Sequence, residues 1–133
     1  MKYLIDTHVL LWSILETKKL PASVAEVLSD TKNEICFSSI NLWEISIKVR
    51  LGKMNLVGLT TDDVVPSALK IGFLPIALLP EEAITQGRMA ENTHFDPFDR
   101  MLIWQAISRG LVLVSGDREF ERFKPDGLKL LWN

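Results

Sequence analysis

The chain has 133 residues, of which 47% are hydrophobic, and it carries a net charge of −2. This length and composition fit a single domain, residues 1–133, with an ordinary core and no linker or repeat. The acidic balance argues against a module held on nucleic acid mainly by Lys and Arg. It does not argue strongly against a nuclease, because metal ions can compensate clustered acids.

The single cysteine and the lengths of the apolar runs indicate where in the cell the protein is expected. The single cysteine, Cys36, cannot form an internal disulfide. No uncharged apolar stretch approaches the ~20 residues that are needed to span a bilayer. Asp6 also comes too early for the apolar core of a signal peptide. We therefore expect a soluble, cytoplasmic protein without a membrane segment.

Short apolar runs alternate with amphipathic segments along the chain. Runs rich in Leu, Ile and Val predict buried strands, and the run interrupted by Pro75 predicts a short or edge strand. In chain order, strands are expected at residues 3–5, 34–37, 73–76, 111–114 and 128–132. Helices are expected at residues 9–15, 21–28, 39–51, 60–72, 80–91 and 96–110.

Capping residues mark several of the helix ends. Ser38 or Ser39 can cap the helix after the second strand, and Gly110 is suited to end the last long helix. The alternation of strands and helices predicts an α/β fold. We expect a mostly parallel central sheet with right-handed crossovers and helices on both faces, an α/β/α sandwich.

Two aspartates stand at strand ends. Asp6 directly follows the first strand, and Asp117 follows the strand at residues 111–114 through Ser115 and Gly116. Parallel sheets place their ligands at the carboxyl ends of the strands, so both carboxylates are expected at one point. The structural alternative is that Asp6 caps the following helix and that Asp117 is a turn or cap residue.

Glu44 is harder to explain as a surface acid. Ile40, Glu44, Ile47 and Leu51 share one helical face, which places the carboxylate inside an apolar stripe. A buried carboxylate needs a basic partner, a proton or a metal ion. The alternative is a pair resembling a capping box, in which Glu44 reaches back to the helix start beside Asn41.

Two further acids open the last long helix. Asp96 is suited to cap this helix, with Pro97 at the first helical position. The helix dipole favours Asp99 at the third position, but one residue suffices for the cap. We assign Asp96 mainly to structure and Asp99 mainly to chemistry.

Four motifs stand in the order and at the spacing of a known family. They are Asp6-Thr7-His8-Val9-Leu10-Leu11-Trp12, Trp43-Glu44-Ile45, His94-Phe95-Asp96-Pro97-Phe98-Asp99-Arg100-Met101-Leu102 and Ser115-Gly116-Asp117. The chain resembles the PIN-domain ribonucleases and, more narrowly, the VapC toxins of type II toxin–antitoxin systems. The resemblance spans nearly the whole chain, and its most specific part is the segment from Asp96 to Leu102.

The resemblance implies a compact parallel-sheet fold and endoribonuclease activity dependent on Mg²⁺ or Mn²⁺. It further implies a homodimer, a cognate antitoxin protein, structured RNA such as tRNA as substrate, and products with a 5′-phosphate and a 3′-hydroxyl. By position, Ser115 matches the small hydroxyl residue before the last acid. The acidic quartet that matches the family comprises Asp6, Glu44, Asp99 and Asp117.

The chemistry of carboxylates gives an independent reason for such a quartet. Carboxylate oxygens suit Mg²⁺ and Mn²⁺, and clustered acids repel each other unless a cation is present. We expect Asp6 and Asp99 to be the most direct metal ligands. Glu44 and Asp117 complete the site directly or through water, and an alternative role for Glu44 is to position the nucleophilic water.

Other residues near these motifs have open roles. His8 and His94 do not stand in a zinc-ligand pattern, and we favour orienting or capping roles for both. Arg100 is expected to pair with the carboxylate of Asp96 or Asp99 rather than with a phosphate.

A basic group and several tryptophans complete the candidates. The clearest basic group comprises Lys48, Arg50 and Lys53. This group either contacts the RNA backbone or is a solvated helix end favoured by the dipole. Core or dimer packing, rather than base stacking, is expected for Trp12, Trp43 and Trp104.

Two other classes of protein compete with the nuclease interpretation. A phosphoacceptor signalling domain of receiver type also has an acid-lined parallel sheet, and Lys124-Pro125 fits its late Lys-Pro. It is disfavoured because paired acids after the first strand and an aspartate at the end of the middle strand are missing. The second alternative is a catalytically idle partner that uses the PIN fold only for binding.

Overall fold

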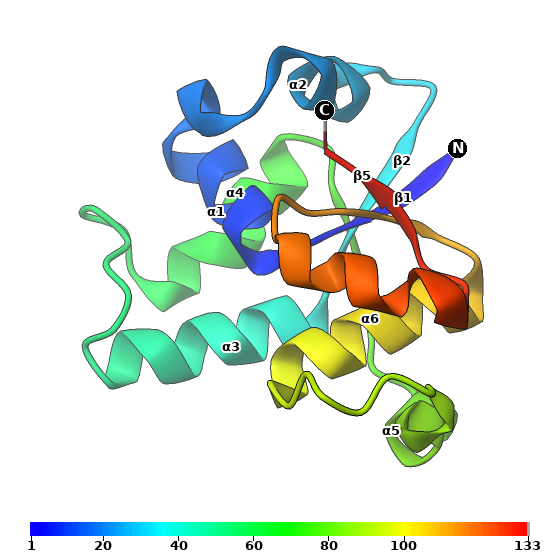
Figure 1. The fold of residues 1–133 in the computed structure, drawn as a ribbon. Helices are drawn as coiled ribbons and strands as arrows, with labels where there is room; N and C mark the ends of the chain where they lie inside the picture. The colour runs from blue at the N-terminus through cyan, green and yellow to red at the C-terminus, as the bar shows by residue number, and fades with distance from the viewer. Residues whose placement is uncertain (133) are drawn as a thin grey trace.

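The computed structural model describes residues 1–132, which form one five-stranded sheet with helices packed around it (Figure 1). The strand order is β3-β2-β1-β4-β5, and each neighbouring pair is parallel. The strands are β1 (Lys2–Ile5), β2 (Glu34–Ser38), β3 (Leu74–Ile76), β4 (Val112–Val114) and β5 (Lys129–Leu131). The predicted parallel sheet is therefore confirmed, with the segment containing Pro75 at one edge, where its missing N–H is tolerated.

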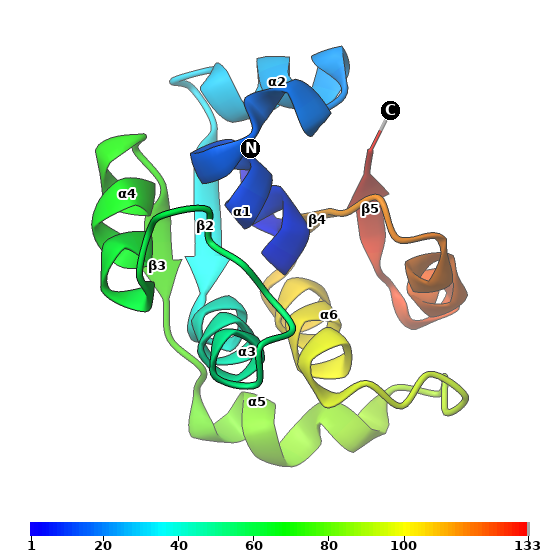
Figure 2. The same cartoon turned by 90° about the vertical axis from the view of Figure 1, so that its left-hand side faces the viewer.

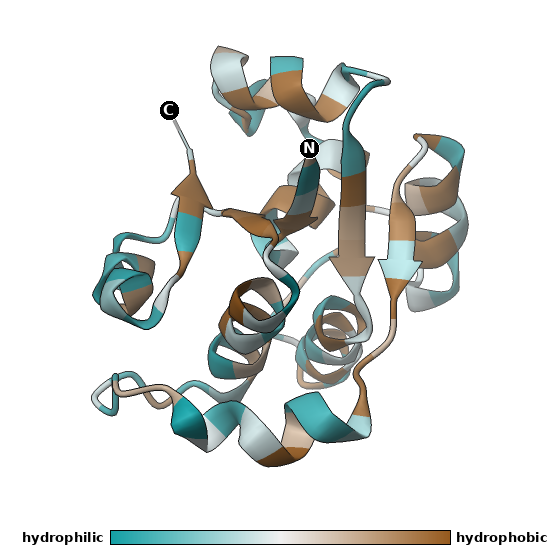
Figure 3. Cartoon of the chain, turned by 90° about the vertical axis from the view of Figure 1, so that its right-hand side faces the viewer, coloured by the Kyte–Doolittle hydropathy of each residue, from teal (hydrophilic) through white to brown (hydrophobic). Residues whose placement is uncertain are grey.

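Alternate residues of the central strands pack into two separate cores. In β1, Tyr3 and Ile5 belong to one hydrophobic cluster, whereas Leu4 belongs to the other. The same alternation places Phe37 and Cys36 of β2 in different clusters. Figure 3 shows the hydrophobic residues that run along these strands. Side chains that are buried on both faces explain why the strands read as continuous apolar runs.

Helices cover both faces of the sheet. The α-helices are α1 (Thr7–Leu15), α2 (Ala22–Ser29), α3 (Ser39–Arg50), α4 (Val64–Lys70), α5 (Pro80–Thr85) and α6 (Pro97–Arg109). The 3₁₀ segments are η1 (Thr17–Lys19), η2 (Thr61–Asp63), η3 (Gln86–Arg88) and η4 (Arg118–Asp126). Helices α1, α2 and α4 contribute to one core, and α6 and η4 contribute to the other (Figures 1 and 2). The predicted α/β/α sandwich is confirmed.

Helix α3 occupies a special place, because it packs against both α1 and α6 (Figure 2). Ile45 of α3 belongs to the first core and Ile40 to the second. Ser38, not Ser39, caps the helix, and the Asn41 side chain accepts a hydrogen bond from the Ser38 N–H at 2.7 Å. This capping box anchors α3 at the carboxyl end of β2.

The predicted caps of the last long helix are confirmed. Asp96 accepts a hydrogen bond from the Asp99 N–H at 2.9 Å, and Pro97 opens α6. Gly110 ends the helix in the left-handed conformation, with φ of 66°.

The predicted helix at residues 80–91 is too long. Helix α5 ends at Thr85, and η3 ends at Arg88. Beyond it, the Asp126 carboxylate accepts hydrogen bonds from the N–H groups of Ala90 and Glu91, at 2.7 and 3.1 Å. This long-range contact, which local propensity cannot reveal, fixes the chain in a non-helical path after η3.

Segment η4 was not predicted from the sequence. Asp117 caps it, and its buried residues Phe120 and Phe123 are three positions apart. That spacing matches the three residues per turn of a 3₁₀ helix rather than the 3.6 of an α-helix. Within residues 1–132, every helix is too short or too polar to cross a bilayer.

Candidate active site

The four predicted acids line one small cavity beyond the carboxyl ends of β1, β2 and β4. The cavity has a volume of about 110 Å³. Its lining includes Asp6 from the end of β1, Glu44 from α3, Asp99 from α6 and Asp117 from the loop after β4. Residues that are 111 positions apart in the sequence, as Asp6 and Asp117 are, therefore meet because parallel strands end at the same edge of the sheet.

Asp6 is both a helix cap and a buried member of this cavity. Its side chain is 7% exposed and accepts a hydrogen bond from the Val9 N–H at 2.8 Å, which caps α1. Burial raises the pKa of this carboxyl, although the Ser115 hydroxyl and the Val9 N–H oppose the shift. The capping alternative is correct, and it leaves the second carboxylate oxygen of Asp6 without a part in the cap.

Glu44 is buried and has a basic partner. Its Oε2 forms an ion pair with Lys48 Nζ, one helical turn later on α3. Its Oε1 accepts a hydrogen bond from the Thr7 hydroxyl at 2.6 Å. The Glu44–Asn41 capping alternative is wrong, because Asn41 itself closes the capping box with Ser38.

Asp99 projects from the first turn of α6 and meets a histidine. His94 Nε2 lies 2.9 Å from Asp99 Oδ2, which is the geometry that an orienting role for His94 requires. Burial raises the pKa of Asp99 to about 6, and the negative charges of Asp96 and Glu44 contribute, whereas His94 opposes the shift. Asp99 is therefore a carboxyl whose charge is disfavoured by its surroundings.

The role predicted for Arg100 is wrong. Its Nη1 donates to the backbone carbonyls of Glu91 and His94, at 2.9 and 3.0 Å, instead of pairing with a carboxylate. The guanidinium also lies over the ring of Phe123, 5.7 Å from its centre. Through these contacts, Arg100 anchors the loop that carries His94.

Asp117 is the most exposed member of the quartet. It caps η4 by accepting from the Glu119 N–H at 2.9 Å, and its own N–H donates to the Ser115 hydroxyl at 3.1 Å. A Cβ in place of the Gly116 hydrogen would lie 2.7 Å from the Trp132 ring, so any larger residue there would force Trp132 to move. The capping alternative is again correct, and the carboxylate still lines the cavity beside Asp6.

A buried chain of hydrogen bonds connects this cavity to Glu82 on α5. Asn41 donates to the Thr7 hydroxyl at 3.1 Å, and Ser38 donates to Gln105 Oε1 at 2.5 Å. Gln105 Nε2 then donates to Glu82 Oε1 at 3.1 Å. Asn41 was expected only as a capping residue, and no role was predicted for Thr7 or Gln105, although polar residues on the inner faces of helices were the available signal.

The remaining candidates are divided between the cavity and the surface. Lys48 lies in the cavity, while Arg50 and Lys53 are exposed. His8 is exposed but also lines the cavity, and its ring lies 5.8 Å from that of Trp12. Core packing is confirmed for Trp104, whose indole N–H is bonded to Thr85. Trp12 is half-buried but belongs to neither core, and its ring lies 6.0 Å from that of Trp132. Trp43 is instead 55% exposed, against Phe98 at 5.1 Å.

The donor set suits a hard divalent cation. Carboxylate oxygens are the preferred ligands of Mg²⁺ and Mn²⁺, and Asp6 and Asp99 both have raised pKa values that a nearby cation would reverse. Within residues 1–132, however, no three His, Cys, Asp or Glu side chains lie close enough together to form a ready-made metal site. The metal ligands therefore stay a prediction.

Comparisons with known proteins agree with this architecture. The chain is 28% identical over 124 residues to the tRNA(fMet)-specific endonuclease VapC of Shigella flexneri, with 92% of each chain covered. It resembles the crystal structure of VapBC2 from Rickettsia felis bound to a promoter DNA fragment, with a TM-score of 0.71, 19% identity and 100% of both chains covered. VapBC-1 from nontypeable Haemophilus influenzae gives a TM-score of 0.67 at 20% identity, with 98% and 97% of the two chains covered.

The family model described as PIN domain matches residues 3–124, which include all four cavity acids and every strand except β5. Because this match covers far more than half of the sequence, the chain belongs to the PIN-domain family.

Proposed function

We propose that this protein is a Mg²⁺- or Mn²⁺-dependent endoribonuclease that acts as the toxin of a type II toxin–antitoxin pair. The observation that carries the proposal is the cavity that Asp6, Glu44, Asp99 and Asp117 line together. The likeness to an endonuclease named VapC supports the reaction type. The likeness to VapBC structures supports the toxin role.

Asp6 and Asp99 are the proposed principal metal ligands, and Glu44 and Asp117 complete the site directly or through water. A bound divalent cation would supply Lewis acidity, which lowers the pKa of a water and neutralises charge that develops on the phosphate. Glu44, fixed by Thr7 on one oxygen, would orient the attacking water. His94 would hold Asp99 in place through their 2.9 Å contact. The products are a 5′-phosphate and a 3′-hydroxyl.

The receiver alternative conflicts with the topology. Flavodoxin-like domains, which include receivers, have the strand order 2-1-3-4-5, in which β1 and β3 are neighbours. Here β1 lies between β2 and β4, and β3 is at the edge. The PIN-domain match points the same way.

An idle binding partner is also disfavoured. Asp6 and Asp99 are destabilised as anions in the folded protein, because their pKa values are raised by burial. Carboxyl groups whose pKa values are strongly shifted by burial occur more often at functional sites than at purely structural ones. A chain that only binds another protein gains nothing from these disfavoured charges.

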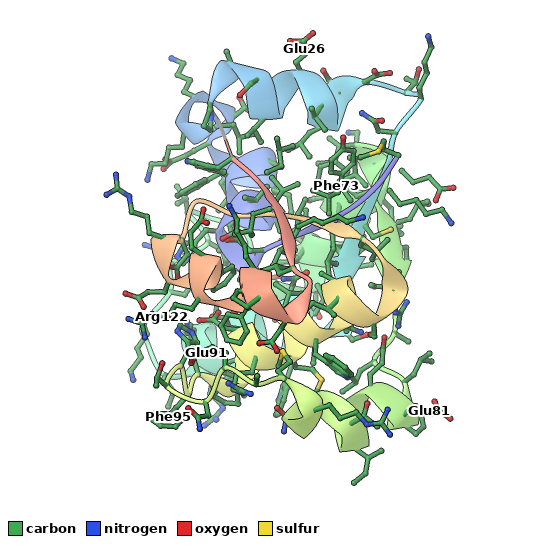
Figure 4. All side chains as sticks on the ribbon, turned by 45° about the vertical axis from the view of Figure 1, so that its right-hand side comes forward. Glu26, Phe73, Glu81, Glu91, Phe95 and Arg122 are labelled. Carbon is green, nitrogen blue, oxygen red and sulfur yellow. The ribbon has the colours of Figure 1, made fainter. Side chains whose placement is uncertain are left out.

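The proposed partners are an RNA such as tRNA, a cognate antitoxin and a second copy of the chain. Exposed apolar side chains are available for protein contacts, among them Ile84 at 84% and Phe95 at 81% exposure. Figure 4 shows Phe95 at the edge of the molecule. Light scattering at micromolar concentration would test the homodimer, and a monomer would contradict it.

Cleavage of total RNA by the purified, antitoxin-free chain tests the central proposal. We expect cleavage with Mg²⁺ or Mn²⁺, none with EDTA, and none from Asp99→Asn. Asp62→Asn is the matched control, because Asp62 is exposed and lines a different cavity. Absence of cleavage by the wild type, or cleavage that survives both EDTA and Asp99→Asn, would refute the nuclease mechanism.

Growth arrest tests the toxin role. Expression of the intact chain should stop growth, whereas Asp6→Asn and Asp99→Asn should be tolerated at equal protein level. Asp62→Asn should remain toxic. Equal toxicity of the wild type and both cavity variants would show that the acids do not carry the effect.

A further inference from the structure

Lys48 lies inside the acid-lined cavity, although the sequence alone placed it with the basic residues at the end of a helix. It shares the lining of this cavity with Asp6, Glu44 and Asp99. Its Nζ contacts Glu44 Oε2 at 2.5 Å, and the Lys48 side chain is 32% exposed while that of Glu44 is 9% exposed. A cation of the chain itself therefore stands among the carboxylates.

Both oxygens of Glu44 are already engaged. Oε2 pairs with Lys48, and Oε1 accepts the hydrogen bond from Thr7 at 2.6 Å. Each oxygen keeps a second lone pair, but a cation that approached Oε2 would meet the positive charge of Lys48. A divalent cation would compete with Lys48 rather than with the neutral Thr7 hydroxyl, because the metal ion and the ammonium group are both positive and repel each other beside the same carboxylate.

We infer that Lys48 is the built-in counter-ion of this site and competes with the divalent metal ion for Glu44. The inference rests on the proposed function, since it concerns the same metal site. With no metal bound, the ammonium group compensates a buried carboxylate that would otherwise be uncompensated. When metal binds, it must overcome this ion pair, so part of the metal's binding free energy is spent on releasing Lys48.

The other basic residues at this end of α3 provide a matched control. Lys53 carries the same charge and follows α3 closely, but it is exposed and lies outside the cavity lining. Salt screens an exposed charge outside the cavity, so removing the Lys53 charge should alter metal binding only slightly. A comparison of Lys48→Met with Lys53→Met therefore separates the specific ion pair from the general loss of one positive charge.

Calorimetric titration of MnCl₂ into the metal-free full chain is the direct test. We expect Lys48→Met to bind Mn²⁺ about tenfold more tightly than the wild type, which corresponds to about 1.4 kcal/mol. Lys48→Arg, which keeps the charge, should stay near the wild-type affinity, and Lys53→Met should stay within about twofold of it. Lys48→Gln serves as a second neutral variant if Lys48→Met does not fold.

Thermal unfolding gives a second readout that needs no RNA. Without metal, Lys48→Met should melt at a lower temperature than Lys53→Met, because it leaves Glu44 without its partner. Saturating Mn²⁺ should raise the melting temperature of Lys48→Met more than that of the wild type.

The outcomes separate this inference from the proposed function. If the wild type binds Mn²⁺ and the neutral Lys48 variants bind it equally or more weakly, the counter-ion role is wrong while the metal site stands. If neither the wild type nor any variant binds Mn²⁺, the metal site itself is wrong, and the counter-ion role falls with it.

Discussion

Two glutamates in this protein are equally buried, yet their surroundings differ. As whole residues, Glu44 and Glu82 are each 6% exposed, and each has a basic partner on a helix. Glu82 accepts hydrogen bonds from Arg109, Gln105 and the Leu79 N–H. Burial raises the pKa of Glu82, but these donors outweigh it and hold the value at about 2.

Glu44 has fewer donors and more acids around it. Thr7 and Lys48 are its hydrogen-bond partners, and its negative charge contributes to the raised pKa values of Asp6 and Asp99. Burial and a salt bridge therefore do not distinguish a chemical site from a structural one. The distinguishing feature is the presence of further carboxylates near Glu44, which favours binding of a cation there. The donors around Glu82 already compensate its charge.

The largest expected difference between the two glutamates is in catalysis. Glu44→Gln should lower RNA cleavage roughly 10³-fold, within the range of about 10²–10⁴ associated with a positioned acid or base. Glu82→Gln should retain wild-type cleavage at a temperature where it is folded. Rates of cleavage of one labelled RNA at saturating Mn²⁺ would measure both. Similar losses in the two variants would erase the distinction drawn above.

Stability should show the opposite order. The pKa of Glu82 lies at about 2 instead of 4.5, so its charged form stabilises the fold by about 3 kcal/mol above pH 4.5. Glu82→Gln should lose most of this in urea unfolding at pH 7. The gap between variant and wild type should shrink as the pH falls from 4.5 through 2, where Glu82 becomes protonated. A gap that does not change with pH would contradict this explanation.

Asp99→Asn should make the protein more stable although it removes activity. Because the folded pKa of about 6 exceeds the ordinary 3.8, stability falls as the pH rises from 4 through 6 and stays lower above it. At pH 8 we expect the variant to gain about 2 kcal/mol, since the 24% exposed side chain is partly solvated. At pH 4 the gain should vanish. Equal or lower stability of Asp99→Asn at pH 8 would contradict the raised pKa.

Gln105 links the two regions, and its loss should have the smallest effect. Gln105→Leu would leave the buried Ser38 hydroxyl without its acceptor and remove one donor to Glu82, at an expected loss of about 1–2 kcal/mol. Mn²⁺ affinity should remain within about twofold of the wild type, because Thr7 and Lys48 still hold Glu44. Urea unfolding and calorimetry would measure the two quantities, and a large change in affinity would show that the regions are coupled.

The sequence predicted what depends on neighbours along the chain. Alternating apolar residues identified the buried strands, and Asp96-Pro97 and Gly110 marked the ends of α6, because caps and side-chain alternation act over a few residues. Glu44 was identified as an anomaly because it interrupts an apolar stripe. Its Lys48 partner, four residues later on the same helix, was within reach of the same reasoning.

Only the tertiary structure decided which of these groups meet. It brought Asp6, Glu44, Asp99 and Asp117 to one cavity. It also directed Arg100 to the carbonyls of the loop that carries His94, and it paired Glu82 with Arg109. It also fixed the chain beyond η3, where the distant Asp126 carboxylate binds the N–H groups of Ala90 and Glu91. Such contacts depend on how strands and helices pack in three dimensions, and separation along the chain carries little information about them. Local order was therefore readable from the residues themselves, whereas the partners of each buried charge were set by the assembled fold.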